Sequence, residues 1–170
     1  VHQRISKSEA WEKSVSLMER VRIPDPENRA KDFPHQFSGG QRQRIMIAMA
    51  LALNPDVLIA DEPTTALDVT IQAEILKLLR ELREERDMSL ILITHDLGIA
   101  AQNANNVIVM KEGEIVEDGN VKSVFSNPKS EYTKKLMASL PGERNHSNKK
   151  KKKIKSKEPI LKLRSITKAY

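Results

Sequence analysis

The sequence has 170 residues, of which 39% are hydrophobic, 31% charged and 4% aromatic. This apolar content is sufficient for a packed core and excludes wholesale disorder, while every apolar run is too short to cross a bilayer. The absence of cysteine excludes a disulfide framework and any Cys-ligated zinc or iron–sulfur site. The sequence begins Val-His-Gln-Arg and carries no signal-peptide pattern, so we expect it to be part of a longer protein.

The net charge of +6 comes from one segment. Residues 142–157 contain eight basic residues and one acid, a net charge of +7, which leaves −1 for the other 154 residues. A nucleic-acid-binding domain usually shows a basic face with interleaved aromatic side chains; outside this segment the sequence has neither, so nucleic acid is not an expected partner. The segment is interpreted as a solvated linker, with contact to anionic lipid or RNA as the alternative.

Hydrophobic periodicity predicts a helix over residues 8–21, and Pro24 and Pro26 end it. A second helix, rich in Ile, Met, Ala and Leu, is predicted over residues 39–53, ahead of Pro55.

Residues 57–60 and 90–93 are unbroken apolar runs, the pattern of parallel strands that are buried on both faces. Between them, Asp68 is predicted to cap a long amphipathic helix that continues to about residue 86. Apolar strands that alternate with helices predict an α/β fold with a mostly parallel sheet and flanking helices.

The remaining predicted elements are shorter. A helix is expected over residues 96–102, and a hairpin over residues 107–116. Further helices are expected over residues 121–126 and 131–140, and a new strand over residues 160–166.

Ser38-Gly39-Gly40-Gln41 opens the second predicted helix. Ser-x-x-Gln is the pattern of a capping box, in which the two side chains satisfy backbone N–H groups reciprocally. A cap does not require two glycines, each of which costs ~1 kcal/mol relative to alanine, and bare backbone at a helix N-terminus also suits phosphate. From these residues alone, a cap and a phosphate site are equally good interpretations.

Two adjacent carboxylates, Asp61 and Glu62, follow the first apolar strand. Open α/β sheets bind ligands at the carboxyl ends of their strands, and neighbouring side chains of an extended strand point to opposite faces. One carboxylate can therefore serve Mg²⁺ while the other polarises a water. Ordinary helix capping is the alternative for such a pair.

Asp68 alone is explained as the N-cap of the long helix, and His95, in Thr94-His95-Asp96 after the second strand, as a structural histidine. Both strands, however, end in polar, titratable side chains at the same edge of the predicted sheet. This convergence predicts one shared site.

The order and spacing of these motifs closely resemble those of the ATP-binding cassette (ABC) ATPase family. Residues 37–44 are similar to the family's signature motif, and residues 58–63 to its Walker B strand and the glutamate that follows. Residues 66–68 resemble the D-loop, and His95 the switch histidine. The resemblance covers residues 5–141 and implies part of a P-loop NTPase-like core, with part of the helical signature subdomain and a C-terminal hairpin.

The resemblance also implies roles for these residues. Asp61 would hold Mg²⁺ through water, Glu62 would be the general base, and His95 would contact the γ-phosphate of ATP. Asp68 would communicate across the interface with a second cassette. The nucleotide bound chiefly by that second cassette would be clamped by Ser38, Gly39 and Gly40, with Gln41 beside them. Phosphoryl transfer depends on positioning and charge neutralisation, which a carboxylate–metal–His cluster supplies.

The resemblance divides the chain into residues 1–55, part of the helical signature subdomain, and residues 56–141, the C-terminal part of the ATPase core. No Gly-x-x-x-x-Gly-Lys-Ser/Thr loop occurs in the sequence. In the family this Walker A loop lies upstream of the residues matched here, so we expect the 170-residue chain alone not to hydrolyse ATP. Residues 142–158 are the Lys-rich linker.

Residues 159–170 resemble the first strand of another ABC cassette, in which Tyr170 would stack on adenine. A generic edge strand is the alternative. If the resemblance holds, the parent protein carries two cassettes in tandem.

Residues 125–141 resemble the tail of the ATPases that energise oligopeptide, dipeptide and nickel importers, although residues 129–131 replace the His-Pro pair usual before the tyrosine. The resemblance implies the ATPase subunit of an importer of the peptide type, a peripheral protein on the cytoplasmic face of the membrane that couples ATP hydrolysis to transport through permease subunits. A substrate-binding protein would be an indirect partner. The alternatives are a soluble tandem ABC ATPase that acts on ribosomes or nucleic acid, and a degenerate cassette that only binds nucleotide. The sequence does not name the solute.

Overall fold

The computed structural model describes residues 5–139. Its elements in chain order are α1 (Lys7–Arg20), α2 (Pro26–Arg29), the 3₁₀ helix η1 (Pro34–Gln36), α3 (Gly39–Leu51), β1 (Val57–Asp61), α4 (Val69–Arg86), β2 (Ser89–Ile93), α5 (Leu97–Asn103), β3 (Asn106–Lys111), β4 (Glu114–Asn120), α6 (Val121–Ser126) and α7 (Glu131–Ala138). The helices and strands predicted up to α7 are confirmed, and β4 continues further than predicted, to Asn120. The short elements α2 and η1 were not predicted, and the strand expected over residues 160–166 lies outside the described residues.

One cluster of buried apolar side chains joins α1 and α3 to β1 and α4. Val21, Leu51 and Leu79 are almost fully buried in it, and burial of a side chain of this size contributes about 1.5–3 kcal/mol relative to exposure. Helix α1 begins at a capping box formed by Ser6 and Glu9. The helical N-terminal part of the chain and the β1–α4 unit are thus packed on a common core.

Strands β1 and β2 pair in parallel, with Val57 opposite Ser89 and Asp61 opposite Ile93. Leu58 of β1 points into the core shared with α4. The prediction that both strands are buried on both faces is wrong for the described residues, because no described helix covers the second face. That face exposes Val57, Ile59, Ile91 and Ile93.

Strands β3 and β4 form a separate antiparallel hairpin with an irregularity between Val109 and Met110. Its turn places Glu112 and Gly113 at positive φ, where glycine carries no steric penalty. Helices α6 and α7 pack against this hairpin. The described residues therefore contain one parallel and one antiparallel pair, and the expected parallel sheet is represented by β1 and β2.

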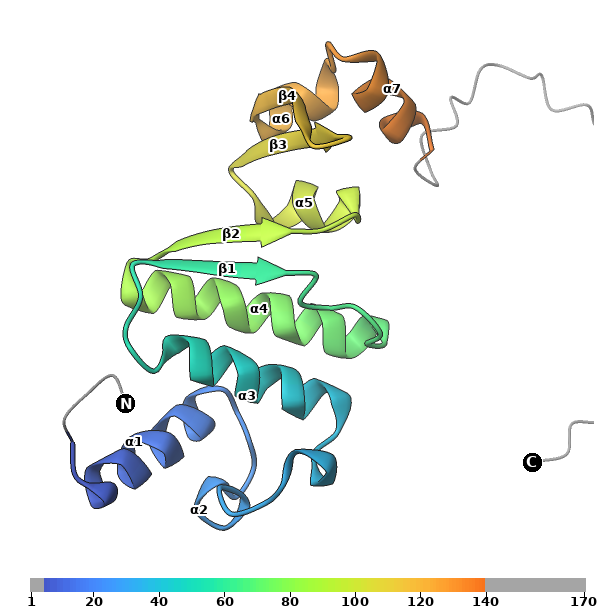
Figure 1. Ribbon diagram of the computed structural model, residues 1–170. Helices are drawn as coiled ribbons and strands as arrows, with labels where there is room; N and C mark the ends of the chain where they lie inside the picture. The colour runs from blue at the N-terminus through green and yellow to red at the C-terminus, as the bar shows by residue number, and fades with distance from the viewer. Residues whose placement is uncertain (1–4, 140–170) are drawn as a thin grey trace, which may run out of the picture.

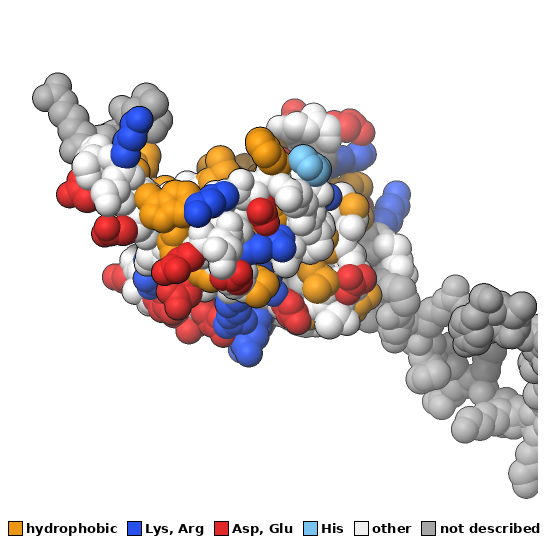
Figure 2. Space-filling view, turned by 90° about the horizontal axis from the view of Figure 1, so that it is seen from below, with side chains coloured by type: hydrophobic (Ala, Val, Ile, Leu, Met, Phe, Trp, Pro, Cys, Tyr) orange, Lys and Arg blue, Asp and Glu red, His pale blue; other side chains and the backbone are white. Residues whose placement is uncertain are grey.

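One side of the molecule contains the N-termini of α3 and α4 together with the carboxyl ends of β1 and β2 (Figure 1). This side therefore collects all the described motifs that the sequence singled out. On the face seen in Figure 2, acidic and basic side chains lie beside one another, with hydrophobic patches between them. Among residues 5–139, no helix has the length and apolar character needed to span a membrane.

Candidate functional site

Glu62 and His95 are in direct contact at the carboxyl ends of β1 and β2. Atom Nδ1 of His95 lies 2.7 Å from Oε1 of Glu62, and the backbone N–H of His95 donates to the same oxygen at 3.1 Å. Strand pairing accounts for the contact, because the N–H of Glu62 donates to the carbonyl of Ile93 at 3.0 Å and continues the ladder by one residue. The two strand ends thus meet in one place, as parallel pairing requires.

This contact changes the acid–base behaviour of both side chains. The hydrogen bond from His95 lowers the pKa of the Glu62 carboxyl below its ordinary value of 4.5; partial desolvation opposes this effect and Thr65 adds to it. The Glu62 carboxylate raises the pKa of the His95 imidazole above 6.5, and the charge of Asp96 contributes in the same direction. Glu62 is therefore ionised at neutral pH and can accept a proton.

Asp61, the last residue of β1, carries a different kind of carboxylate. Its side chain is exposed and makes no hydrogen bond or ion pair within residues 5–139. The described part of the chain has no group of three or more His, Cys, Asp or Glu side chains that could hold a metal ion. Magnesium in proteins takes one or two carboxylates and completes its shell with water and phosphate oxygens. The free carboxylate of Asp61 fits that requirement.

The N-terminus of α3 is a complete capping box. The N–H of Gln41 donates to Oγ of Ser38 at 3.2 Å, and Oε1 of Gln41 accepts from the N–H of Ser38 at 3.0 Å. The first-turn N–H groups of Gly39 and Gly40 have no intrahelical acceptor, as in any helix. The cap interpretation is therefore confirmed, and it leaves these two backbone donors available for an anion.

Asp68 and Asp96 cap the two helices that follow the strands. Oδ1 of Asp68 accepts from the N–H groups of Thr70 and Ile71 at 3.1 and 3.0 Å. Oδ1 of Asp96 accepts from the first turn of α5 in the same way. The predicted capping role of Asp68 is thus confirmed, and any role across an interface would be additional to it.

The predicted site residues do not all converge. Ser38 and Gln41 make no hydrogen bond to Glu62 or His95 in the described structure, and their helix contacts the chain after β1 instead, where Gly39 faces Leu67. Tyr170 lies outside the described residues, as does the Lys-rich segment. The described residues thus place the Ser38–Gln41 cap and the acid–imidazole pair at one side of the molecule, as two separate groups.

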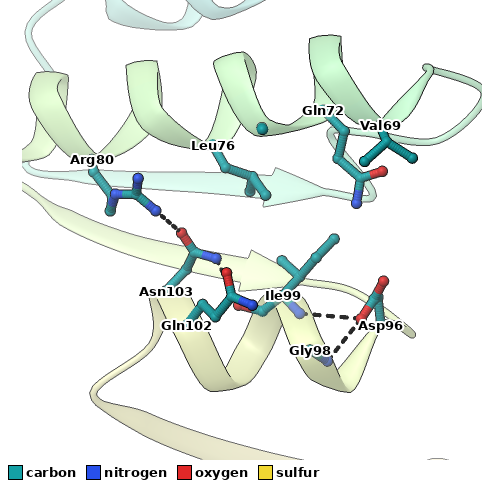
Figure 3. A pocket seen from close by; sticks show the side chains of 10 residues that line it. Val69, Gln72, Leu76, Arg80, Asp96, Gly98, Ile99, Gln102 and Asn103 are labelled. Carbon is teal, nitrogen blue, oxygen red and sulfur yellow. Dashed lines mark hydrogen bonds between the residues drawn. The ribbon is translucent and has the colours of Figure 1, made fainter. Parts of the chain in front are cut away.

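A cavity of about 320 Å³ lies between α4 and α5. It is lined by Asp96 near the site and by Arg80 and Asn103 at its far end, which are joined by a hydrogen bond (Figure 3). Glu62, His95 and the signature residues are not part of its wall. The position of this cavity therefore does not mark the acid–imidazole pair.

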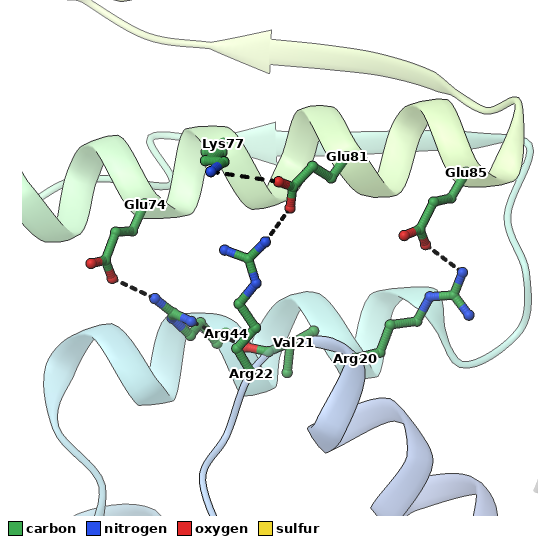
Figure 4. A network of polar contacts seen from close by, with 8 residues as sticks. All are labelled: Arg20, Val21, Arg22, Arg44, Glu74, Lys77, Glu81 and Glu85. Carbon is green, nitrogen blue, oxygen red and sulfur yellow. Dashed lines mark hydrogen bonds and ion pairs between the residues drawn. The ribbon is translucent and has the colours of Figure 1, made fainter.

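The sequence reasoning missed a set of ion pairs that joins α4 to the N-terminal helical part. Acidic side chains along one side of α4 face arginines from the end of α1, the segment after it, and α3 (Figure 4). Arg44 and Glu74 are 2.6 Å apart, and Arg44 is the most buried arginine of the set. The pairs are Arg20–Glu85, Arg22–Glu81 and Arg44–Glu74. The one local signal for these ion pairs is Arg44, an arginine in α3 three residues after Gln41.

Thr65 was also not predicted from the sequence as a site residue. Its hydroxyl donates to Oε2 of Glu62 at 3.1 Å. The available signal was a hydroxyl residue three positions after the carboxylate, with a proline between them.

Comparison with known proteins places these motifs in context. A family model described as "ABC transporter" matches residues 2–65. The oligopeptide transport ATP-binding protein OppD of Bacillus subtilis is 57% identical over 140 residues, which are 82% of this chain and 39% of that protein. The dipeptide transport ATP-binding protein DppD of the same organism is 56% identical over 82% of this chain and 42% of its own length. The chain thus spans about two fifths of these curated relatives.

The solved structures that resemble this chain also come from ABC transporters. A bacterial ABC transporter cassette solved as a dimer is 32% identical, with a TM-score of 0.60 over 71% of this chain and 51% of that one. The protein cbiO1 from Clostridium perfringens, described as part of an ABC transporter complex, is 35% identical, with a TM-score of 0.64 over 82% of this chain and 54% of that one.

Proposed function

Because this chain belongs to the ABC transporter ATP-binding family, we propose that the full-length protein hydrolyses ATP to drive import of peptides through a membrane permease. The observation that carries the proposal is the contact of Glu62 with His95, since it holds an ionised carboxylate beside an imidazole at the end of a parallel strand pair. The names of the relatives support peptides as the solute class.

In this proposal Glu62 is the general base. The carboxylate is ionised at neutral pH, with a pKa lowered chiefly by the hydrogen bond from His95. As the ionised form it can accept a proton from the attacking water. The imidazole of His95 contacts the γ-phosphate, while the backbone N–H of His95 donates a hydrogen bond to the Glu62 carboxylate. Mg²⁺ held through Asp61 would supply charge neutralisation for the phosphates.

The N-terminus of α3 serves a second cassette. Ser38, Gly39, Gly40 and Gln41 present a capped helix end with free N–H groups, and an anion there is favoured by the helix dipole. Their separation from Glu62 supports assignment of the two groups to different nucleotides. A dimeric, post-hydrolysis cassette bound to ADP and phosphate is among the similar structures.

The partners follow from the same proposal. The protein sits on the cytoplasmic face of the membrane, binds integral permease subunits and acts indirectly with a substrate-binding protein. Nucleic acid is not among the proposed partners.

Purification and uptake test the proposal together. Full-length protein, tagged in its own cells and solubilised in detergent, is expected to retain hydrophobic permease subunits, and uptake of a labelled tripeptide is expected to stop in Glu62→Gln. Glu112→Gln is the matched control, because Glu112 is an exposed carboxylate in the β3–β4 turn. Co-sedimentation with ribosomes, with uptake unaffected by Glu62→Gln, would contradict the proposal.

A further inference from the structure

The two carboxylate oxygens of Glu62 accept hydrogen bonds from different residues. Oε1 accepts from the backbone N–H of His95 and contacts its imidazole, at 3.1 and 2.7 Å. Oε2 accepts from the hydroxyl of Thr65 at 3.1 Å. The terminal torsion of a glutamate is soft and roughly two-fold, so contacts at both oxygens fix the plane of the carboxylate, whereas contacts at one oxygen leave it free to rotate.

The backbone around Glu62 explains how Thr65 reaches it. Glu62 is in the left-handed region with φ of 46°, and the N–H of Thr65 donates to the carbonyl of Glu62 at 3.1 Å to close a turn. Pro63 and Thr64 within this turn are buried, while Thr65 is exposed. A non-glycine residue persists in the left-handed region only where its surroundings hold it. Thr65 provides two of these contacts, one to the backbone and one to the side chain of Glu62.

We propose that Thr65 is a positioning residue, whose hydroxyl holds the Glu62 carboxylate in the orientation needed to take a proton from water. This inference rests on the proposed role of Glu62 as general base. When the imidazole of His95 turns from Oε1 to a phosphate group, the hydroxyl of Thr65 is the side-chain contact that remains on the carboxylate. Its contribution is therefore greatest in the hydrolytic step.

Thr65→Val in the full-length protein removes the hydroxyl at almost constant shape. A misplaced catalytic group costs up to about 10²-fold in rate, and a single lost orienting hydrogen bond is expected to lower kcat about 5- to 20-fold. KM for ATP and the equilibrium affinity for ATP are expected to stay within about twofold, because Thr65 acts through Glu62. Thr65→Ser, which keeps a hydroxyl, is expected to restore kcat to within about twofold.

Two controls separate this role from a structural one. Thr70→Val removes an exposed threonine hydroxyl from the first turn of α4 and is expected to leave kcat unchanged. In a Glu62→Gln background, Thr65→Val is expected to have no further effect on kcat. A crystal structure of full-length Thr65→Val is expected to show the carboxylate of Glu62 rotated away from its wild-type orientation.

The possible failures are distinguishable. Full ATPase activity in Glu62→Gln would overturn the proposed function itself. An inactive Glu62→Gln together with a wild-type kcat in Thr65→Val would overturn only the role of Thr65. A rise in KM with unchanged kcat, or a Thr65→Ser variant as slow as Thr65→Val, would likewise overturn it.

Discussion

A methyl group added to Gly40 would place its carbon 2.6 Å from Cγ2 of Ile71, well inside van der Waals contact. The first turn of α3 thus approaches the first turn of α4 so closely that a side chain at this position would force Ile71 to shift. The same test at Gly39 finds Cδ2 of Leu67 at an ordinary 3.5 Å. The two adjacent glycines are therefore constrained differently. Packing against Ile71 disfavours a side chain at Gly40, whereas the space around Gly39 would accept a methyl group.

Gly40→Ala is expected to destabilise the full-length protein and Gly39→Ala is not. Overpacking costs about 1–3 kcal/mol, and Ile71 is stiff at χ1 in a helix, whereas the gain in helix propensity is ~1 kcal/mol. We expect the free energy of unfolding, measured in urea, to fall by about 1 kcal/mol in Gly40→Ala and to stay level or rise in Gly39→Ala. In an Ile71→Ala background the penalty at Gly40 should vanish. Equal losses at both glycines would contradict this explanation.

The ion pair between Arg44 and Glu74 is expected to couple α3 to α4 more strongly than a surface pair does. The side chain of Arg44 is 12% exposed, but that of Glu74 is 47% exposed, so solvent screening limits the gain. A double-mutant cycle with Arg44→Met and Glu74→Gln should give a coupling of about 0.5–1 kcal/mol. The matched control is Lys111–Glu112, where both side chains are more exposed. A coupling no larger than the control, or one insensitive to salt, would refute this expectation.

The Glu62–His95 contact predicts a defined pH dependence. The raised pKa of His95 contributes stability that is fully present below 6.5 and lost as the pH rises through the folded-state pKa. The lowered pKa of Glu62 contributes stability that is present above 4.5 and lost as the pH falls through its folded-state pKa. The contact is therefore expected to stabilise the fold most between pH 4.5 and 6.5.

NMR titration of the imidazole of His95 in the full-length protein measures this directly. The pKa is expected to lie above 6.5 in the wild type and to move down in Glu62→Gln, because the largest cause of the shift is removed. Glu112→Gln should leave it unchanged. An imidazole that titrates identically in wild type and Glu62→Gln would show that the contact does not form in solution.

Two substitutions of Asp68, to alanine and to serine, distinguish its role as a helix cap from a role in ATP hydrolysis. Asp68→Ala removes an N-cap that accepts two N–H groups and is expected to cost about 1 kcal/mol of stability. Asp68→Ser keeps a capping oxygen and should restore most of it. If Asp68 also acts across a cassette interface, Asp68→Ser will be stable but slow in ATP hydrolysis. Wild-type ATPase activity in Asp68→Ser would restrict the residue to its cap.

Features that depend on neighbours in sequence could be predicted. The caps at Ser38 and Asp68 involve residues two or three positions apart, so a short motif contains both partners. The meeting of Glu62 and His95 also followed from the sequence, because two apolar strands of similar length that pair in parallel end at the same edge. Both predictions needed only local pattern and one rule of topology.

Features that depend on backbone irregularity or on distant packing could not be predicted. Strand alternation placed Asp61 and Glu62 on opposite faces, but Glu62 has left the strand and has positive φ, for which a glutamate gives no signal. The reason for Gly40 lies at Ile71, and the partner of Arg44 is 30 positions away at Glu74. The apolar pattern of β1 and β2 predicted burial on both faces, whereas the described residues cover one.

The proposed function depends on Glu62 acting as the general base for ATP hydrolysis. Phosphate release by the full-length protein, with Mg²⁺ and ATP, tests it when wild type, Glu62→Gln and the control Glu112→Gln are measured together. We expect Glu62→Gln to bind ATP as tightly as wild type but to release phosphate at least about 100-fold more slowly, with Glu112→Gln unchanged. Phosphate release by Glu62→Gln within about twofold of wild type would contradict the role of Glu62 as general base.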